Sequence, residues 1–248
     1  MNALEYGHQE TYTIRAYEID GNRRMRVPAL LKMLHEAAMQ NVLRIKLSFW
    51  DLQPHHISWV LMRQVLHIER MPLLGETVTI HTRPSGFERI FTYRDYKVYD
   101  AEGKLLVSSS STWLLMDVRT RRMARLPDFI LDFKKRVENA KDYLPRCTSK
   151  FETVENPSRT TDFQVRWYDL DFNEHTNNVQ YIRWMLQTLA PDVLRQRQLR
   201  QFEVLFKAEC LLGDNIHAQV QTKDNTTFLH QLQAEDGKTL ALAKSVWK

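Results

Sequence analysis

A short polar run, DLDFNEHTNN, contains the residues best suited to chemistry. It places Asp169, Asp171, Asn173, Glu174 and His175 within seven residues, directly ahead of an apolar stretch with helical spacing. Backbone N–H groups at a helix N-terminus lack partners and the helix dipole is positive there, so this setting suits polarising a carbonyl or holding an anion. Asp and Asn also shape turns and cap helices, so the run by itself leaves a purely structural role open.

The composition is typical of a globular protein. The 248 residues are 43% hydrophobic and 26% charged, with a net charge of +5 that permits an acidic partner. No nucleic-acid-binding motif accompanies the charge, so we expect no nucleic acid. We also expect no signal peptide and no stable membrane insertion, because no basic segment leads into an apolar run and no apolar run approaches about 20 residues. Free thiols at Cys147 and Cys210 would then agree with a cytoplasmic location.

The elements that must position the polar run occur in two sets. In the first half, residues 10–17 alternate like a strand and residues 27–45 carry a helical apolar stripe with Pro28 in the first turn. Four predicted strands follow, at 58–70, 76–86, 89–103 and 104–117. A helix followed by a run of strands predicts an α+β fold with antiparallel pairing between successive strands.

The second set begins after a polar stretch. We expect a domain over 1–126, a linker over 127–159 with a short helix near 129–140, and a domain over 160–248. A strand to Tyr168 and a helix over 178–190 flank the polar run. The remaining strands are predicted at 201–209, 214–223, 226–235 and 238–247, which places Glu209 at a strand end.

The two sets align as a tandem repeat. Three pairs of landmarks keep their order at offsets of 151, 138 and 134 residues: YEIDGN at 17–22 over YDLDFN at 168–173, LLGE at 73–76 over LLGD at 211–214, and Gly103 with Trp113 over Gly237 with Trp247. A conserved order of landmarks indicates an internal duplication.

The repeat separates shared residues from residues found only in the second half. Asp20 and Asn22 occupy the positions of Asp171 and Asn173, so this pair can owe something to loop geometry. The counterpart of His175 is Arg24. The counterparts of Glu209 and Cys210 are Met71 and Pro72. His175, Glu209 and Cys210 therefore occur in the second half alone. This difference between the repeats indicates a function for these residues beyond maintaining the fold.

The motifs resemble those of the acyl-acyl carrier protein thioesterases. DLDFNEHTNNVQYIRWMLQTL is similar to that family's D-x-N-x-H-x-N-N-x-x-Y-x-x-W signature, and VLFKAECLLGD to its second active-site segment. The resemblance covers nearly the whole chain. It implies two tandem hotdog domains, each an antiparallel sheet wrapped around a central helix, and hydrolysis of fatty acyl-carrier protein that ends fatty acid synthesis. Plant members carry a plastid-targeting extension, so the expectation here is a bacterial-type member.

The resemblance also implies a site. Asp171, Asn173, His175 and Glu209 match the family's catalytic network, and Cys210 matches a position once assigned a nucleophile role. A cysteine in an apolar strand is more often a small buried hydrophobe, so we do not favour Cys210. Either Glu209 or His175 could activate water, and a carboxylate that attacks to form an anhydride is the covalent alternative.

The substrate implied is an acyl carrier protein with a 4'-phosphopantetheine-linked acyl chain. An apolar tunnel for the chain is expected along the first helix and the strand after it, at Met33, Leu34, Ala37, Trp59 and Leu61. Basic residues are candidates for docking the acidic carrier protein: Arg121, Arg122, Arg125, Lys134 and Lys135. No cofactor or metal is implied.

Other functions remain open at this point. A hotdog thioesterase acting on coenzyme A thioesters shares the chemistry and differs only in the substrate's handle. A non-catalytic acyl-binding hotdog protein and a hydratase or dehydratase are more distant alternatives. The duplication supplies an internal pseudo-dimer, so the sequence leaves both a monomer and a homodimer open.

Overall fold

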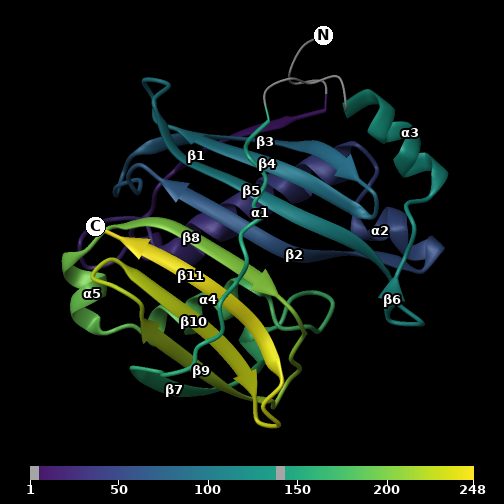
Figure 1. The fold of residues 1–248 in the computed structure, drawn as a ribbon. Coiled ribbons are helices and arrows are strands. Elements are labelled where there is room, and N and C mark those ends of the chain that lie inside the picture. The colour runs from purple at the N-terminus through teal and green to yellow at the C-terminus, as the bar shows by residue number, and fades with distance from the viewer. Residues whose placement is uncertain (1–5, 138–142) are drawn as a thin grey trace.

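The computed structural model describes residues 6–137 and 143–248. In that part of the chain, an eleven-stranded sheet runs in the order β1-β3-β4-β5-β2-β8-β11-β10-β9-β7, with β6 paired to β5. All pairings between these strands are antiparallel. The sheet curves around α1 and α4, which lie on one of its faces (Figure 1). The α+β class and the tandem hotdog arrangement expected from the sequence are confirmed.

The first half contributes ten short and long elements. They are β1 (His8–Thr13), η1 (Ala16–Glu18), α1 (Val27–Arg44), α2 (Phe49–Leu52), η2 (Gln53–His55), β2 (Ile57–Ile68), β3 (Thr77–Glu88), β4 (Phe91–Tyr99), β5 (Leu105–Asp117) and β6 (Arg122–Met123).

The second half follows the same plan. Its elements are α3 (Asp128–Val137), β7 (Arg159–Gln164), η3 (Trp167–Asp169), α4 (Asn178–Gln187), α5 (Pro191–Gln196), β8 (Leu199–Phe206), β9 (Asn215–Thr222), β10 (Thr227–Ala234) and β11 (Thr239–Trp247).

Helix α1 forms because its apolar residues recur every three or four positions. Pro28 occupies the first turn, where its missing N–H has no partner to lose. Leu30, Leu34 and Ala37 are buried together on one face of the helix. Complete burial of a leucine such as Leu34 contributes about 2 kcal/mol, so the packing of this face holds the helix in the curve of the sheet.

The structure shows the duplication. The elements β1, η1 and α1 each recur 151 residues later as β7, η3 and α4. The two halves then join edge to edge, because β2 pairs with β8 from Arg63↔Leu205 to His67↔Gln201. This pairing turns two sheets into one. The order departs from chain succession, for example at β2, which pairs with β5 and β8, and at β3, which pairs with β1 and β4.

Three predicted boundaries are wrong for local reasons. The first strand ends at Thr13, before 17, because Glu18 accepts the Arg15 N–H and starts a 3-10 turn. The helix expected over 178–190 ends at Gln187 and a new one starts at Pro191, a residue that cannot continue a helix interior. The strand expected at 201–209 is β8, which ends at Phe206, so Glu209 and Cys210 lie in a loop.

The polar stretch between the halves follows the sheet. Helix α3 covers the first part of the helix expected at 129–140, and residues 138–140 lie outside the described residues. Residues 143–158 then cross the face of the sheet opposite α1 and α4 (Figure 1). Contacts with polar side chains hold them there, including Ser149 Oγ to Glu203 Oε2 at 2.8 Å and the Val154 N–H to Gln231 Oε1 at 3.1 Å.

No helix in the described part of the chain is long and apolar enough to cross a membrane.

Candidate active site

The loop between η3 and α4 is shaped by the carboxylate of Asp171. Asp171 Oδ1 accepts the backbone N–H groups of Asn173 at 2.8 Å and His175 at 3.3 Å. Glu174 takes a left-handed conformation, with φ of 61°, and Leu170 bridges Thr176. The carboxylate therefore closes the loop, and His175 lies at the end of the loop, just before α4.

The same loop exists in the first half. Asp20 Oδ1 accepts the N–H groups of Asn22 at 2.8 Å and Arg24 at 3.1 Å, and Arg23 has a φ of 59°. The aspartate in each repeat therefore makes the same turn. What differs is the side chain presented at the end of the loop, which is His175 in one half and Arg24 in the other.

His175 faces the second segment singled out by the sequence. Its Nε2 lies 3.7 Å from Glu209 Oε2, and the two side chains are 42% and 41% exposed, so a substrate can reach both. Thr176 fastens the two segments, because its N–H and its hydroxyl both donate to the Cys210 carbonyl, at 3.3 and 2.7 Å. The predicted meeting of His175 with Glu209 therefore occurs between two loops.

A third side chain completes this group. Arg121, from the turn between β5 and β6 in the first half, donates from Nη2 to Glu209 Oε1. The carboxylate thus has His175 at one oxygen and an arginine at the other. The sequence suggests Arg121 only as a carrier-docking residue and does not predict this contact, because residues 88 positions apart in different repeats share no local pattern.

Cys210 lies beside the site and is only 1% exposed. Its N–H and its thiol both donate to the Tyr181 hydroxyl, at 3.0 and 3.2 Å, and that hydroxyl donates to the Ala208 carbonyl at 3.2 Å. Burial raises the pKa of the Cys210 thiol, which disfavours the reactive thiolate. These contacts describe a residue that holds the Glu209 loop against α4.

The first turn of α4 offers few open donors. Asn177 caps the helix, since its Oδ1 accepts the Val179 N–H at 2.9 Å, and the Gln180 N–H bonds the Asn177 carbonyl at 2.8 Å. Among the described residues, the Asn178 N–H and the Asn173 side-chain amide have no hydrogen-bond partner. These two groups can donate to a substrate oxygen.

Aromatic residues attach the loop to the other half of the protein. The ring of Phe172 stacks on Trp50, with centroids 5.7 Å apart and an interplanar angle of 15°, and it meets Phe49 edge-on at 5.5 Å. Phe49 and Trp50 begin α2. Such contacts are worth about 0.5–1.5 kcal/mol each beyond the area they bury. Nothing in the sequence pattern paired residues 50 and 172.

The expected acyl-chain residues fall into two places. Met33, Leu34, Ala37 and Leu61 are buried in one apolar core shared by both halves. Trp59 packs in a separate cluster under α3 and donates from Nε1 to the Leu47 carbonyl at 2.9 Å. The structure therefore brings four of the five residues together and leaves Trp59 apart from them.

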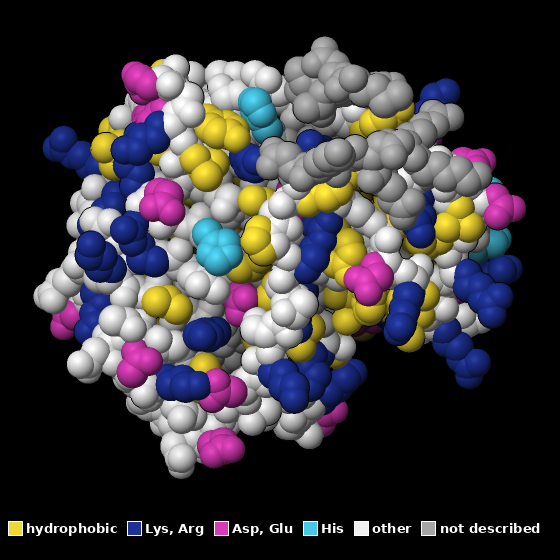
Figure 2. Space-filling model, turned by 45° about the horizontal axis from the view of Figure 1, so that its top comes forward, with side chains coloured by type: hydrophobic (Ala, Val, Ile, Leu, Met, Phe, Trp, Pro, Cys, Tyr) yellow, Lys and Arg dark blue, Asp and Glu magenta, His cyan; other side chains and the backbone are white. Residues whose placement is uncertain are grey.

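The expected docking residues lie at the surface near β6 and α3. Arg122 and Arg125 are exposed and Lys134 is half-buried, whereas the side chain of Lys135 lies outside the described part of the structure. Figure 2 shows Lys and Arg side chains spread over the face, including the side of the molecule on which β6 lies in Figure 1. Of the expected docking residues, Arg121 contacts the His175–Glu209 pair, through Glu209.

The curved sheet around two central helices defines a tandem hotdog protein with one His–Glu pair where its two halves meet. The chain belongs to the acyl-ACP thioesterase family. The model of the acyl-ACP thioesterase N-terminal domain matches residues 5–133, and that of the C-terminal domain matches residues 152–248. The family that the motifs resemble is thereby confirmed.

Relatives and solved structures agree with this assignment. The chain is 26% identical over 261 residues to the chloroplastic palmitoyl-acyl carrier protein thioesterase of Cuphea hookeriana, covering 97% of this chain and 62% of that protein's length. An acyl-ACP thioesterase from Bacteroides thetaiotaomicron matches with a TM-score of 0.90 at 20% identity, over 100% of both chains. The 12:0-ACP thioesterase from Umbellularia californica matches with a TM-score of 0.91 at 20% identity, over 100% of this chain and 99% of that one.

Proposed function

We propose that this protein hydrolyses fatty acyl-acyl carrier protein to a free fatty acid and the carrier protein with its thiol restored. The observation that carries the proposal is the His175–Glu209 pair, accessible from solvent at the end of the loop that gives the family its signature. The relatives with related sequences are named as acyl carrier protein thioesterases, which supports the carrier-bound substrate.

The contacts of Glu209 favour His175 as the base that activates water. Arg121 on one carboxylate oxygen stabilises the ionised form of Glu209, which makes that carboxylate a weaker proton acceptor. An ionised carboxylate beside an imidazole orients the ring and stabilises the imidazolium that forms when it takes a proton. In this proposal Glu209 positions His175, and Asp171 holds the loop that carries it.

The reaction then follows from the donors around the pair. His175 takes a proton from water as the water oxygen bonds to the thioester carbonyl carbon. The Asn178 N–H and the Asn173 amide donate to the oxygen that becomes negative; loss of one such donor typically costs about 3–4 kcal/mol. The carbon–sulfur bond then breaks, and the phosphopantetheine thiolate leaves with the proton held by His175.

The acyl chain is proposed to enter the core beside α1. Met33, Leu34, Ala37 and Leu61 are buried there in one cluster, and they supply the apolar surface that an acyl chain requires. Trp59 is left out because it packs in the other cluster. The named relatives act on acyl groups as different as palmitoyl and 12:0, so the preferred chain length of this protein is a matter for measurement.

Docking of the acidic carrier protein is proposed at Arg122, Arg125 and Lys134. Their position beside β6 and α3 would direct a tethered acyl chain toward Glu209. We further propose a cytoplasmic setting, where such carriers are loaded. The oligomeric state is left to measurement, since the internal repeat already supplies both halves of a hotdog pair.

A matched comparison of substrates tests this function. One acyl chain is presented as the carrier-protein thioester and as the coenzyme A thioester, and release of free fatty acid is measured as kcat/KM. We expect the carrier-bound thioester to be preferred, with the preference reduced when Arg122 and Arg125 are replaced by Glu. Equal or better turnover of the coenzyme A thioester would instead indicate the coenzyme A hotdog thioesterase class.

A further inference from the structure

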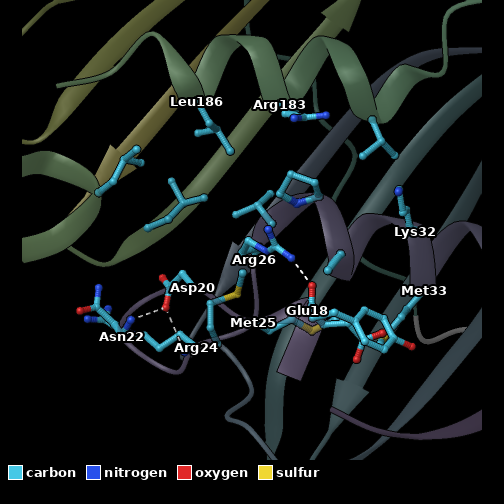
Figure 3. A pocket seen from close by; sticks show the side chains of 18 of the residues that line it. Glu18, Asp20, Asn22, Arg24, Met25, Arg26, Lys32, Met33, Arg183 and Leu186 are labelled. Carbon is cyan, nitrogen blue, oxygen red and sulfur yellow. Dashed lines mark hydrogen bonds between the residues drawn. The ribbon is translucent and has the colours of Figure 1, made fainter. Parts of the chain in front are cut away.

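A cavity of about 1450 Å³ lies away from the His175–Glu209 pair. It is bounded by the first-half loop, by facing surfaces of α1 and α4, and by α5 (Figure 3). Asp20, Asn22 and Arg24 come from the loop, Lys32 and Met33 from α1, and Arg183 and Leu186 from α4. Neither His175 nor Glu209 lines this cavity, which shares Met33 with the surface proposed above for the acyl chain.

Its position is the counterpart of the catalytic loop in the other repeat. Asp20 closes the loop with the same two hydrogen bonds that Asp171 makes, as the dashed lines in Figure 3 mark. Arg24 stands where the second half has His175, and Met71 stands where it has Glu209; both line the cavity. The site thus keeps the loop and the helix N-terminus of a thioesterase site and lacks a base.

The cavity presents cations that the protein itself does not neutralise. Among the described residues, the side chains of Arg24 and Lys32 make no hydrogen bond or ion pair. In the same part of the chain Arg183, which is the repeat counterpart of Lys32, makes one hydrogen bond, to Gln180 Oε1 at 3.5 Å. An unpartnered guanidinium in a cavity lined by further basic groups favours an anionic ligand.

The acidic residues that line the cavity are largely engaged elsewhere. Asp20 is used by its own loop, as described above. Glu18 Oε2 accepts the Arg15 N–H at 2.8 Å, and Glu36 Oε1 accepts from Gln40 at 2.6 Å. The basic residues outnumber these three carboxylates; they are Arg15, Arg24, Arg26, Lys32, Arg183, Arg195 and Arg197.

Much of the remaining lining is apolar. It includes the buried side chains of Met25, Val27, Met33, Leu186 and Leu199. A cavity with an apolar lining and basic groups on its walls suits a molecule that has an apolar tail and a single negative head.

We propose that this cavity is a second, non-hydrolytic site that binds a fatty carboxylate, with the carboxylate on Arg24 and the tail on the apolar lining. The choice of a fatty carboxylate rests on the proposed function, because it is the product that the hydrolytic site would release. A site that has Arg in place of His and Met in place of Glu can hold this anion without activating water.

Calorimetric titration of the full-length protein with decanoate tests the site. We expect decanoate to bind, and Arg24→Gln to remove or weaken one binding event by about tenfold or more, as expected when a charged hydrogen bond is lost. Lys32→Gln, at an exposed position on α1 and apart from Arg24 in Figure 3, should fold normally and weaken binding less than Arg24→Gln. His175→Ala should retain this binding event. Lys238→Gln, in the exposed β10–β11 turn, is the matched control and should behave as the unmodified protein.

Three results would reject the site. A titration of Arg24→Gln that matches the unmodified protein, or no decanoate binding at all, would show that Arg24 holds no carboxylate. Binding of uncharged decan-1-ol as tight as that of decanoate would have the same meaning. If the unmodified protein binds decanoate but does not hydrolyse acyl-carrier protein thioesters, the proposed function is rejected and the binding site is retained.

Discussion

His175 and Glu209 are the pair on which the chemistry depends, and their neighbours assign them different tasks. Glu209 has an imidazole at one oxygen, 3.7 Å away, and Arg121 at the other. A carboxylate held ionised by arginine is better suited to orienting a base than to being one. Cys210, buried and hydrogen-bonded to Tyr181, belongs to the support of the loop.

Substitution of the three residues should separate these tasks. We expect His175→Ala and Glu209→Gln to reduce kcat by about a hundredfold or more, in the range of lost general-base catalysis. Cys210→Ala should keep most of the activity, because a protonated, buried thiol is no nucleophile. Steady-state hydrolysis of one carrier-bound thioester measures all three. A Cys210→Ala variant that is folded and inactive would reinstate the nucleophile role.

Arg121 should affect the rate more than substrate binding. Removing its charge in Arg121→Ala makes Glu209 easier to protonate, so the acid limb of the kcat pH profile should move to higher pH. Arg121→Lys, which keeps the charge, should restore much of the original profile. The matched control is Arg122→Ala, one residue along and proposed to bind the carrier protein, for which we expect a change in KM with the pH profile unaltered. A profile that Arg121→Ala leaves in place would show that this contact is irrelevant to catalysis.

At the scale of elements, the repeated loop serves as an internal control. Asp20 and Asp171 make the same pair of backbone hydrogen bonds, so each should contribute similarly to stability. Only the second loop positions a histidine for catalysis. The duplication therefore distinguishes what the fold requires from what the reaction requires.

We expect Asp20→Ala and Asp171→Ala to lower the free energy of unfolding by similar amounts, about 1 kcal/mol each, as is typical for lost side-chain caps of backbone N–H groups. Asp171→Ala alone should reduce hydrolysis strongly. Asp171→Asn, which retains the accepting oxygen, should recover the stability and reveal whether the negative charge itself matters. Equal loss of activity in Asp20→Ala would contradict the separation of the two loops.

Much of the element pattern could be predicted because it is local or repeated. The offset of 151 residues aligns Asp20 with Asp171 in the sequence itself, and the apolar spacing predicts the helix at α1. The β2–β8 junction, the Phe172–Trp50 stack and the Arg121–Glu209 contact could not, because each joins residues distant in sequence and from different repeats. The sequence predicts Glu209 at a strand end, whereas the structure places it in a loop. The pairing of β8 with β11 stops at Phe206, because the next two N–H groups, of Lys207 and Ala208, both donate to the Leu240 carbonyl.

At the scale of the whole molecule, buried histidines link stability to acidity. His230 on β10 is completely buried, with its Nε2 2.8 Å from Ser245 Oγ, and burial lowers the pKa of its imidazole to about 4. Burial also lowers the pKa of His35, on α1. In the native protein both imidazole rings therefore stay neutral at pH values at which the same rings in the unfolded chain would bind protons.

The stability of the protein should therefore depend on pH. Between about pH 6.5 and pH 4 the unfolded state binds more protons than the native state, so the free energy of unfolding should fall as the pH falls. For His230 alone the loss should be roughly 2 kcal/mol between pH 7 and pH 5. Urea unfolding at the two pH values measures it. His230→Gln, which can still bond Ser245, should flatten the dependence, and an unchanged slope in that variant would assign the loss to other groups.

The central claim, direct attack of water under the control of His175 and Glu209, is tested most directly by a single turnover of acyl-carrier protein in water labelled with heavy oxygen. The label is then followed in the released fatty acid and in the peptide that contains Glu209. We predict that the label appears in the fatty acid, that Glu209 stays unlabelled, and that His175→Ala releases almost no fatty acid in the same time. Label in the Glu209 carboxylate would show that it attacks the thioester itself through an anhydride, and would contradict the account.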